Sequence, residues 1–278
     1  MNAAGLTSAE PAVRRRPVDL DISGVRLYGE WVEPEAAGDR APLVFLHEGL
    51  GSVRQWVSGA MDVPATIAAA TGRRAFVYDR LGFGRSPALT RQRQPDYLYD
   101  EALETLPAVI EALGLETCVP VGHSDGATIA LILAARRPDL VAGLVIEAPH
   151  VVVESRTLAG IRAAQAAFDD PEGRLRPGLE RYHGEKTAAT FSGWADVWLT
   201  PEFARFSMLD DLPGITAPLL VIQGEDDEYG TPRQLDLIVA GVGGPVSTRM
   251  IPGCRHIPHF QAFDSVMPLM ADFIAPLP

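Results

Sequence analysis

The chain of 278 residues has only two cysteines, Cys118 and Cys254, which are too few for a disulfide framework and show no metal-ligand spacing. No apolar run reaches the roughly 18 residues that a membrane-spanning helix needs. The first 17 residues lack the apolar segment of a signal peptide, and no such segment follows the arginines at 14–16. We therefore expect a cytoplasmic protein with a flexible segment at 1–17, no membrane partner and no bound metal.

Positive charge is also scarce, since 24 lysines and arginines stand against 36 aspartates and glutamates, for a net charge of −12. This balance disfavours nucleic acid and anionic membranes as partners, and it says little about a small-molecule substrate. The chain is 47% hydrophobic and 22% charged, which is typical of a globular protein. Its length suits one large α/β domain, alone or with an insertion, and leaves the oligomeric state open.

Apolar runs alternate with helical patterns along most of the chain. Strands are predicted at residues 18–22, 25–32, 42–46, 74–78, 119–121, 141–146, 218–222 and 246–251. Helices are predicted at residues 63–70, 97–113, 125–137, 232–240 and 263–274. Strands that are apolar throughout are typical of a parallel sheet covered on both faces. The pattern predicts an α/β fold with a doubly wound, mostly parallel sheet of eight strands.

One interval, residues 149–212, contains helical patterns and no convincing strand. We expect it to form a helical lid inserted between two parts of one α/β core, residues 1–148 and 213–278. Ligands of open α/β sheets bind outside the carboxyl ends of the strands, where such an insertion would lie. Most of its many aromatic side chains should form the lid's own core, while one or two should face a substrate.

The sequence Gly122-His123-Ser124-Asp125-Gly126 joins a predicted strand to a predicted helix. Gly-x-Ser-x-Gly in this setting is typical of a nucleophile elbow, a tight turn that exposes a reactive serine. The flanking glycines let the strand and helix backbones approach, and the helix N-terminus favours negative charge beside Ser124. Ser124 is therefore the candidate nucleophile.

A serine hydroxyl needs a base that accepts its proton and an acid that orients the base. Of the six histidines, four lie in other motifs or in or beside the expected lid: His47, His123, His150 and His183. His256 directly follows the last predicted strand and is the candidate base, in preference to His259. Four carboxylates at 225–228 follow another strand. Asp227 is the candidate acid among them, and Asp226 is the alternative.

An oxyanion hole for this chemistry would need two backbone N–H groups. One should belong to Asp125, the residue after the nucleophile, and the other to Gly49 in the loop 47–51. Glycine permits close backbone approach at that position. Candidate substrate-binding residues come from this loop and from the expected lid: Glu48, Leu50, His150, Trp194 and Trp198.

The order Ser124, Asp227, His256 is that of the α/β hydrolases. Together with the segments at 46–56, 79–86, 122–126, 224–227 and 253–256, it resembles the α/β-hydrolase fold superfamily, of the lid-bearing kind related to small esterases, lactonases and carbon–carbon bond hydrolases. The resemblance covers residues 18–274. It implies a Ser124–His256–Asp227 triad, with an oxyanion hole from Gly49 and Asp125 and a structural loop at 79–86. Glu48 and Arg255 replace frequent glycines.

By this resemblance we expect a serine hydrolase that cleaves a small carboxylic ester, thioester or lactone through an acyl-enzyme, without a cofactor. Carbon–carbon bond hydrolysis on the same triad is the alternative, because fold and triad do not fix the substrate. An acidic substrate of that reaction would need cationic groups, for which Arg54, Arg156 and Arg162 are candidates. A non-catalytic ligand-binding protein of the same fold is a third alternative, against which the presence of all three triad residues speaks.

Overall fold

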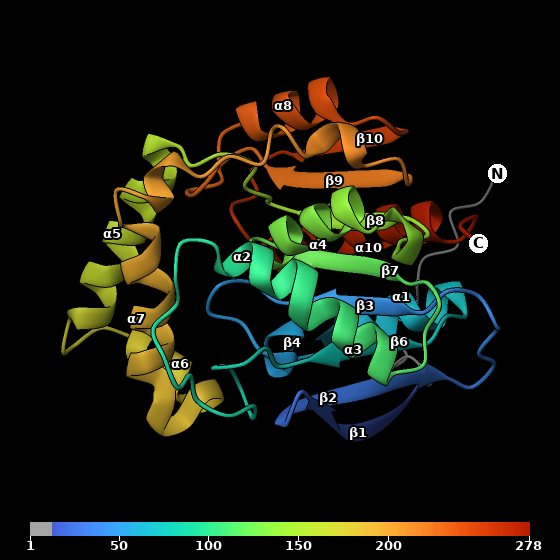
Figure 1. Ribbon diagram of the computed structural model, residues 1–278, viewed down its shortest axis with the longest axis horizontal. Coiled ribbons are helices and arrows are strands. Elements are labelled where there is room, and N and C mark those ends of the chain that lie inside the picture. Colours follow the sequence, from blue (N-terminus) through green and yellow to red (C-terminus); the bar gives the residue numbers. More distant parts are fainter. Residues whose placement is uncertain (1–12) are drawn as a thin grey trace.

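The computed structural model describes residues 13–278, and an eight-stranded sheet lies at its centre (Figure 1). Its strands are β1 Val13–Ile22, β2 Val25–Pro34, β3 Leu43–Leu46, β6 Ala75–Tyr78, β7 Val119–His123, β8 Leu144–Glu147, β9 Leu219–Gly224 and β10 Val246–Ile251. The strand order is β1-β2-β6-β3-β7-β8-β9-β10. The pairs β1–β2 and β2–β6 are antiparallel, and every other neighbouring pair is parallel. The predicted mostly parallel sheet of eight strands is therefore confirmed.

Helices cover both faces of this sheet and extend beyond one of its edges. They are α1 Val63–Thr71, α2 Tyr97–Asp100, α3 Leu106–Ala112, α4 Asp125–Arg136, α5 Ser155–Asp169, α6 Leu175–His183, α7 Thr187–Trp198, α8 Arg233–Gly241, α9 Pro258–Gln261 and α10 Phe263–Ile274. One hydrophobic core holds the inward residues of α1 and α10, and a second core on the other face holds those of α3, α4 and α8. The central strands β3, β6, β7 and β8 are buried along their whole length, which explains why their sequences are apolar on both faces.

The structure also contains small elements that the sequence pattern did not indicate. The short strands β4 Val57–Ser58 and β5 Met61–Asp62 pair with each other outside the main sheet. Between α2 and α3 the helix is π-helical at Glu101–Thr105. None of the helices in residues 13–278 is both long and apolar enough to cross a membrane.

The expectation of a flexible segment at 1–17 is wrong for residues 13–17, which form the first half of β1. The guanidinium of Arg15 donates hydrogen bonds to Glu30 at 2.9 Å and to Asp62 at 2.7 Å, and thereby ties β1 to its neighbour and to the start of α1. These partners are remote in sequence, so no local pattern reveals the strand. The remainder of the expected flexible segment, residues 1–12, lies outside the described residues.

The interval between β8 and β9 is built from helices, apart from an isolated bridge between Val152 and Ser207. Helices α5, α6 and α7 pack against one another at the left of Figure 1, beyond the carboxyl ends of the parallel strands. Phe168 and Phe191 stack between them, with ring centroids 3.9 Å apart. That these helices act as a lid stays a prediction of the sequence.

Candidate active site

The turn between β7 and α4 holds Ser124 in a strained conformation. Its φ of 53° and ψ of −114° are rare for a residue with a side chain, and such strain persists only where the surroundings enforce it. A Cβ on Gly126 would overlap the carbonyl oxygen of Leu46 at the end of β3, and a Cβ on Gly122 would overlap the backbone of Gly126. Only glycines at both positions allow α4 to start this close to the sheet.

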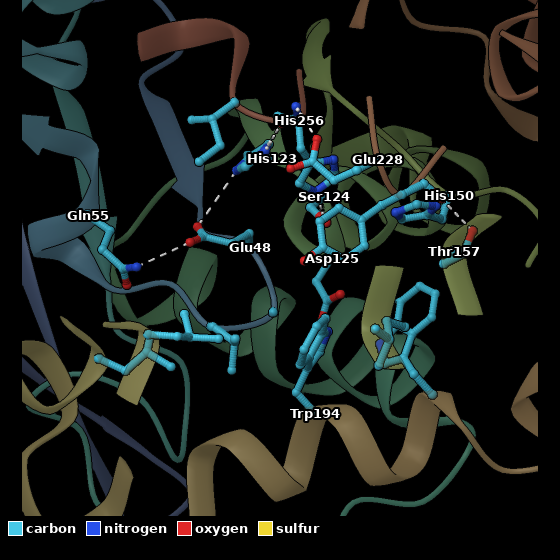
Figure 2. Close-up of a pocket in the computed structure, with 18 of the residues that line it drawn as sticks. Glu48, Gln55, His123, Ser124, Asp125, His150, Thr157, Trp194, Glu228 and His256 are labelled. Atoms are coloured by element: carbon cyan, nitrogen blue, oxygen red, sulfur yellow. Dashed lines mark hydrogen bonds and ion pairs between the residues drawn. The ribbon is translucent and has the colours of Figure 1, made fainter. Parts of the chain in front are cut away.

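Three loops at the carboxyl edge of the sheet bring Ser124, His256 and Asp227 together, and Figure 2 shows the first two of these residues. Nε2 of His256 lies 3.0 Å from Oγ of Ser124, and Nδ1 of His256 lies 2.9 Å from Oδ1 of Asp227. All three side chains are buried. The chain of contacts has the geometry in which an acid fixes the tautomer of a histidine, so that Nε2 can accept the serine proton.

Asp227, and not its neighbour Asp226, is the carboxylate that contacts His256. Burial by itself would raise the pKa of Asp227, but the hydrogen bond and charge of His256 and the N–H of Tyr229 outweigh burial and lower the pKa to about 2. Asp226 is exposed. His259, the alternative base, is buried and lies 2.5 Å from Glu147 through Nδ1, so its hydrogen bond is made away from Ser124.

The loop after β3 places Gly49 against the cavity beside Ser124. A Cβ on Gly49 would overlap the indole ring of Trp194, so this side chain covers the glycine directly. The backbone N–H groups of Gly49 and Asp125 donate no hydrogen bond to any group in residues 13–278. The carboxylate of Asp125 is buried and accepts a hydrogen bond of 2.6 Å from the hydroxyl of Tyr97. Both predicted oxyanion donors are therefore free to bind a ligand.

The cavity beside Ser124 has a volume of about 260 Å³. Every predicted site residue except Asp227, which lies behind His256, lines it: Glu48, Gly49, Leu50, Ser124, Asp125, His150, Trp194, Trp198 and His256. Residues that the sequence analysis missed complete the wall, among them Ile161, Leu175 and Leu179 from α5 and α6. The four-residue spacing of Leu175 and Leu179 predicts that they share one face of a helix, but it does not predict which part of the protein that face contacts.

A carboxylate is the main charge in this cavity. Burial would raise the pKa of Glu48, but the nearby imidazoles, His123 foremost, lower it to about 2. Its Oε1 accepts a long hydrogen bond of 3.3 Å from Gln55, and its Oε2 lies 3.7 Å from Nδ1 of His123 (Figure 2). Burial, and then His256, lowers the pKa of His150 to about 4, so this imidazole is neutral at pH 7.

Lysine and arginine side chains do not line the described part of this cavity. Arg54, Arg156 and Arg162, the candidates for binding an acidic substrate, are exposed and lie outside it. Arg156 instead donates a hydrogen bond of 2.8 Å to the backbone carbonyl of Asp227. Arg255, at the other departure from the superfamily pattern, pairs with Glu228 at 2.8 Å on the surface.

A second cavity of about 190 Å³ adjoins the first. The two share Glu48, Gln55, His123 and Ile257. The remaining walls of the second cavity are mostly apolar or aromatic: Val57, Ser58, Tyr182, His259 and Phe260. In the part of the chain that the structure describes, no group of three or more His, Cys, Asp or Glu side chains is arranged to hold a metal ion.

Comparison with known families assigns this fold to a class. A model described as the alpha/beta hydrolase family matches residues 43–268. The chain therefore belongs to the alpha/beta hydrolase family, as its motifs predict.

Relatives within the family carry hydrolase names. A proline iminopeptidase from Lactobacillus delbrueckii subsp. bulgaricus is 26% identical over 274 residues, which cover 86% of this chain and 91% of the peptidase. The sn-1-specific diacylglycerol lipase ABHD11 from Mus musculus is 34% identical over 132 residues, 47% of this chain and 40% of the lipase. These similarities support hydrolase activity and leave the bond that is cleaved open.

Solved structures agree with the fold. A proline iminopeptidase from Mycobacterium smegmatis has a TM-score of 0.67 at 25% identity, with 93% of this chain and 97% of that one covered. The 2-hydroxy-6-oxo-6-phenylhexa-2,4-dienoate hydrolase BPHD from Rhodococcus sp. strain RHA1 has a TM-score of 0.75 at 12% identity, with 94% and 99% covered. An identity this low shows a shared fold alone.

Proposed function

We propose that the protein is a serine hydrolase that cleaves a small carboxylic ester, thioester or lactone through an acyl-enzyme. The observation that carries this proposal is the continuous chain from Ser124 Oγ to His256 at 3.0 Å and on to Asp227 at 2.9 Å, at the wall of a cavity of about 260 Å³. A nucleophile, a base and an orienting acid in this arrangement are what acyl transfer to serine requires.

In the first half of the reaction, Oγ of Ser124 attacks the carbonyl carbon of the substrate while Nε2 of His256 accepts the hydroxyl proton. The carbonyl oxygen becomes negatively charged and is stabilised by the N–H groups of Gly49 and Asp125. When the tetrahedral intermediate collapses, the bond to the leaving group breaks, and His256 gives its proton to the leaving oxygen or sulfur. Asp227 stabilises the imidazolium that exists between these two transfers.

In the second half, a water molecule attacks the acyl-enzyme and His256 accepts one of its protons. The same two N–H groups stabilise the second oxyanion. Collapse then releases the carboxylic acid and returns the proton to Oγ of Ser124, so the enzyme is regenerated without a cofactor.

The walls of the cavity favour a small, apolar acyl group. Ile161, Leu175, Leu179 and two tryptophans face the space beside Ser124, and burial of apolar substrate surface against them is favourable. We propose that α5, α6 and α7, which supply these residues, form the lid over the substrate. An acidic substrate, as expected for the carbon–carbon hydrolase alternative, would instead meet the carboxylate of Glu48 without a lining Lys or Arg in the described cavity.

A fluorophosphonate probe tests this proposal directly. We expect one adduct per chain, located on Ser124 by mass spectrometry, and none on Ser124→Ala. The wild type should hydrolyse p-nitrophenyl acetate and butyrate faster than the octanoate ester, because the cavity is small. Failure of Ser124 to react with the probe, or full ester hydrolysis by Ser124→Ala, would overturn the proposal.

Glu48 favours a second candidate, the release of an N-terminal residue from a peptide. This ionised side chain lies one residue from the proposed oxyanion donor Gly49 and has only distant partners, so it is placed to bind an ammonium group beside the scissile carbonyl. The proline iminopeptidase from Lactobacillus delbrueckii subsp. bulgaricus, which aligns with most of this chain, is named for such an activity.

Matched amide and ester substrates separate the two candidates. An aminopeptidase should cleave proline or alanine p-nitroanilide and reject the N-acetylated forms, because acetylation removes the positive charge. Glu48→Gln should then abolish p-nitroanilide cleavage and retain hydrolysis of p-nitrophenyl butyrate. If free and acetylated p-nitroanilides are equally poor substrates of the wild type, the peptidase candidate is wrong.

A further inference from the structure

We propose that Arg80 is a positioning residue of the oxyanion hole: together with His47 it fixes the plane of the Glu48–Gly49 peptide so that the N–H of Gly49 faces the cavity. This inference rests on the proposed serine hydrolase function, because the N–H matters only if an oxyanion forms beside Ser124. The motif that contains Arg80, residues 79–86, is expected from the sequence to be structural only. The geometry points to a more direct part in the reaction.

Two buried donors converge on one carbonyl oxygen. The backbone oxygen of Glu48 accepts hydrogen bonds from Nδ1 of His47 at 2.8 Å and from Nη2 of Arg80 at 3.0 Å. Nε2 of His47 accepts the backbone N–H of Arg80 at 3.2 Å, so the ring proton must be on Nδ1. Burial, and then Arg80, holds the pKa of His47 well below its usual range and keeps this tautomer neutral.

The other end of the same peptide unit is the proposed oxyanion donor. No peptide bond in the described chain is cis, and in a trans peptide the C=O and N–H point in opposite directions. Holding the oxygen of Glu48 toward Arg80 therefore directs the N–H of Gly49 the opposite way. Gly49 lines the cavity, and its N–H finds no acceptor elsewhere in residues 13–278.

The positive charge of Arg80, held beside the carbonyl oxygen of Glu48, also strengthens the N–H of Gly49 as a hydrogen-bond donor. Hydrogen bonds within one chain of groups polarise each other, and the effect is larger where water is excluded. Arg80 is completely buried, so its charge acts on the Glu48–Gly49 peptide with little screening. The guanidinium also lies 3.9 Å from Oδ2 of Asp125, the residue that carries the second proposed donor. One cation thus lies beside the carbonyl of the Glu48–Gly49 peptide and beside the side chain of Asp125.

The placement of Arg80 is costly for a structural residue. A buried guanidinium costs free energy for each donor that lacks a hydrogen-bond partner. In the described chain, Nε and Nη1 of Arg80 have no such partner. Its Nη2, in contrast, serves two backbone oxygens, those of His47 at 3.2 Å and Glu48 at 3.0 Å. These hydrogen bonds reach the loop 47–51, which carries the proposed oxyanion donor Gly49. A role of Arg80 in the reaction predicts contacts at this place.

Arg93 provides a matched control. Its guanidinium is also buried and also stacks on the ring of Phe83, 4.5 Å away compared with 4.8 Å for Arg80. Arg93 donates to the carbonyl of Leu81 and contacts neither Gly49 nor Glu48. Replacement of either arginine by lysine disturbs the same core, but only Arg80→Lys removes the contact that fixes the oxyanion loop.

The test measures kcat and KM for a p-nitrophenyl ester and the inhibition constant of a trifluoromethyl ketone, whose hemiketal oxygen occupies the oxyanion site. We expect Arg80→Lys to lower kcat about 10- to 100-fold and to weaken the ketone by a similar factor, with KM nearly unchanged. Arg93→Lys should keep the wild-type values. His47→Phe, which removes the other donor to Glu48, should reproduce the Arg80→Lys pattern if Arg80→Lys does not fold.

Several results would overturn the inference. Wild-type kcat and ketone affinity in Arg80→Lys or His47→Phe would show that the peptide needs no such hold. Equal losses of kcat in Arg80→Lys and Arg93→Lys would show that core packing alone is responsible. In either case fluorophosphonate labelling of Ser124 would still support the proposed function. A wild type that neither reacts with this probe nor hydrolyses esters would instead remove the proposed function itself.

Discussion

The hydroxyl of Tyr97 donates a hydrogen bond of 2.6 Å to Oδ2 of Asp125, the residue that follows Ser124. The indole N–H of Trp198 in turn donates to the oxygen of Tyr97 at 2.8 Å. These contacts link helix α7 to the first turn of α4 through two buried side chains. A carboxylate beside an oxyanion would oppose the reaction, and the hydrogen bond from Tyr97 engages it in the core instead.

Removal of this hydroxyl should affect both stability and catalysis. In Tyr97→Phe a buried carboxylate loses its donor, and we expect the free energy of unfolding to fall by about 1–3 kcal/mol. Because Asp125 also carries a proposed oxyanion donor, kcat for ester hydrolysis should fall as well. Tyr99→Phe is the control, since Tyr99 donates to Asp211 at 2.5 Å, away from the elbow. Equal kcat values for the two variants would contradict this account.

The two neighbouring carboxylates should differ sharply in their effect on the reaction. Asp227→Asn turns an acceptor for His256 into an amide that can favour the wrong tautomer, and kcat should fall roughly 10³- to 10⁴-fold. Asp226→Asn changes an exposed side chain with no contact to His256, so its kcat should stay within about twofold of the wild type. Steady-state kinetics on one p-nitrophenyl ester suffices, and similar losses in both variants would show that Asp227 is not the acid.

Much of the fold could be read from the sequence because its central strands are apolar on both faces. The chain between β3 and β8 alternates such strands with helices, and that alternation specifies a parallel sheet. The start of β1 could not be read in this way. Arg15 is polar, and the partners that hold it, Glu30 and Asp62, are recognised only once the chain has folded.

The same difference between local sequence pattern and long-range contact applies to the candidate site. Ser124, Asp227 and His256 each follow a strand end, so topology alone predicts that they converge. The sequence did not indicate the proposed positioning role of Arg80. Its guanidinium contacts the carbonyl of Glu48, which lies 32 residues earlier in the chain, and no local spacing encodes such a contact. The apolar wall from Ile161 and Leu179 depends on how α5 and α6 pack, which their sequences leave undetermined.

The lowered pKa of His150 should make the folded protein less stable at acidic pH. Burial, and then His256, lowers this pKa to about 4, whereas an unfolded histidine has about 6.5. Below pH 6.5 the unfolded chain therefore binds the additional proton, and stability falls until the pH passes below about 4. The wild type should lose roughly 2 kcal/mol more than His150→Gln between pH 7 and 4.5. Urea unfolding at both pH values measures the difference, in which the contributions of groups remote from His150 cancel. Parallel losses would contradict the prediction.

The same substitution at two helical glycines should change stability in opposite directions. In Gly126→Ala the new methyl group would overlap the backbone oxygen of Leu46, which cannot rotate away, so α4 must move from the sheet. We expect a loss of roughly 4 kcal/mol or more, together with the loss of fluorophosphonate labelling at Ser124. Gly178 lies inside α6 with open space around it, and Gly178→Ala should gain about 0.5–1 kcal/mol from the lower entropy of its unfolded chain.

Denaturant unfolding of both variants provides the measurement, with the unfolding slope showing whether each remains two-state. A wild-type midpoint for Gly126→Ala would mean that the elbow tolerates a side chain at this position. The close approach of α4 to β3 would then not explain why Ser124 is held at a φ of 53°. If Gly126→Ala folds but is no longer labelled, the strain at Ser124 and the reactivity of its hydroxyl have a common origin in the contact between this helix and the sheet.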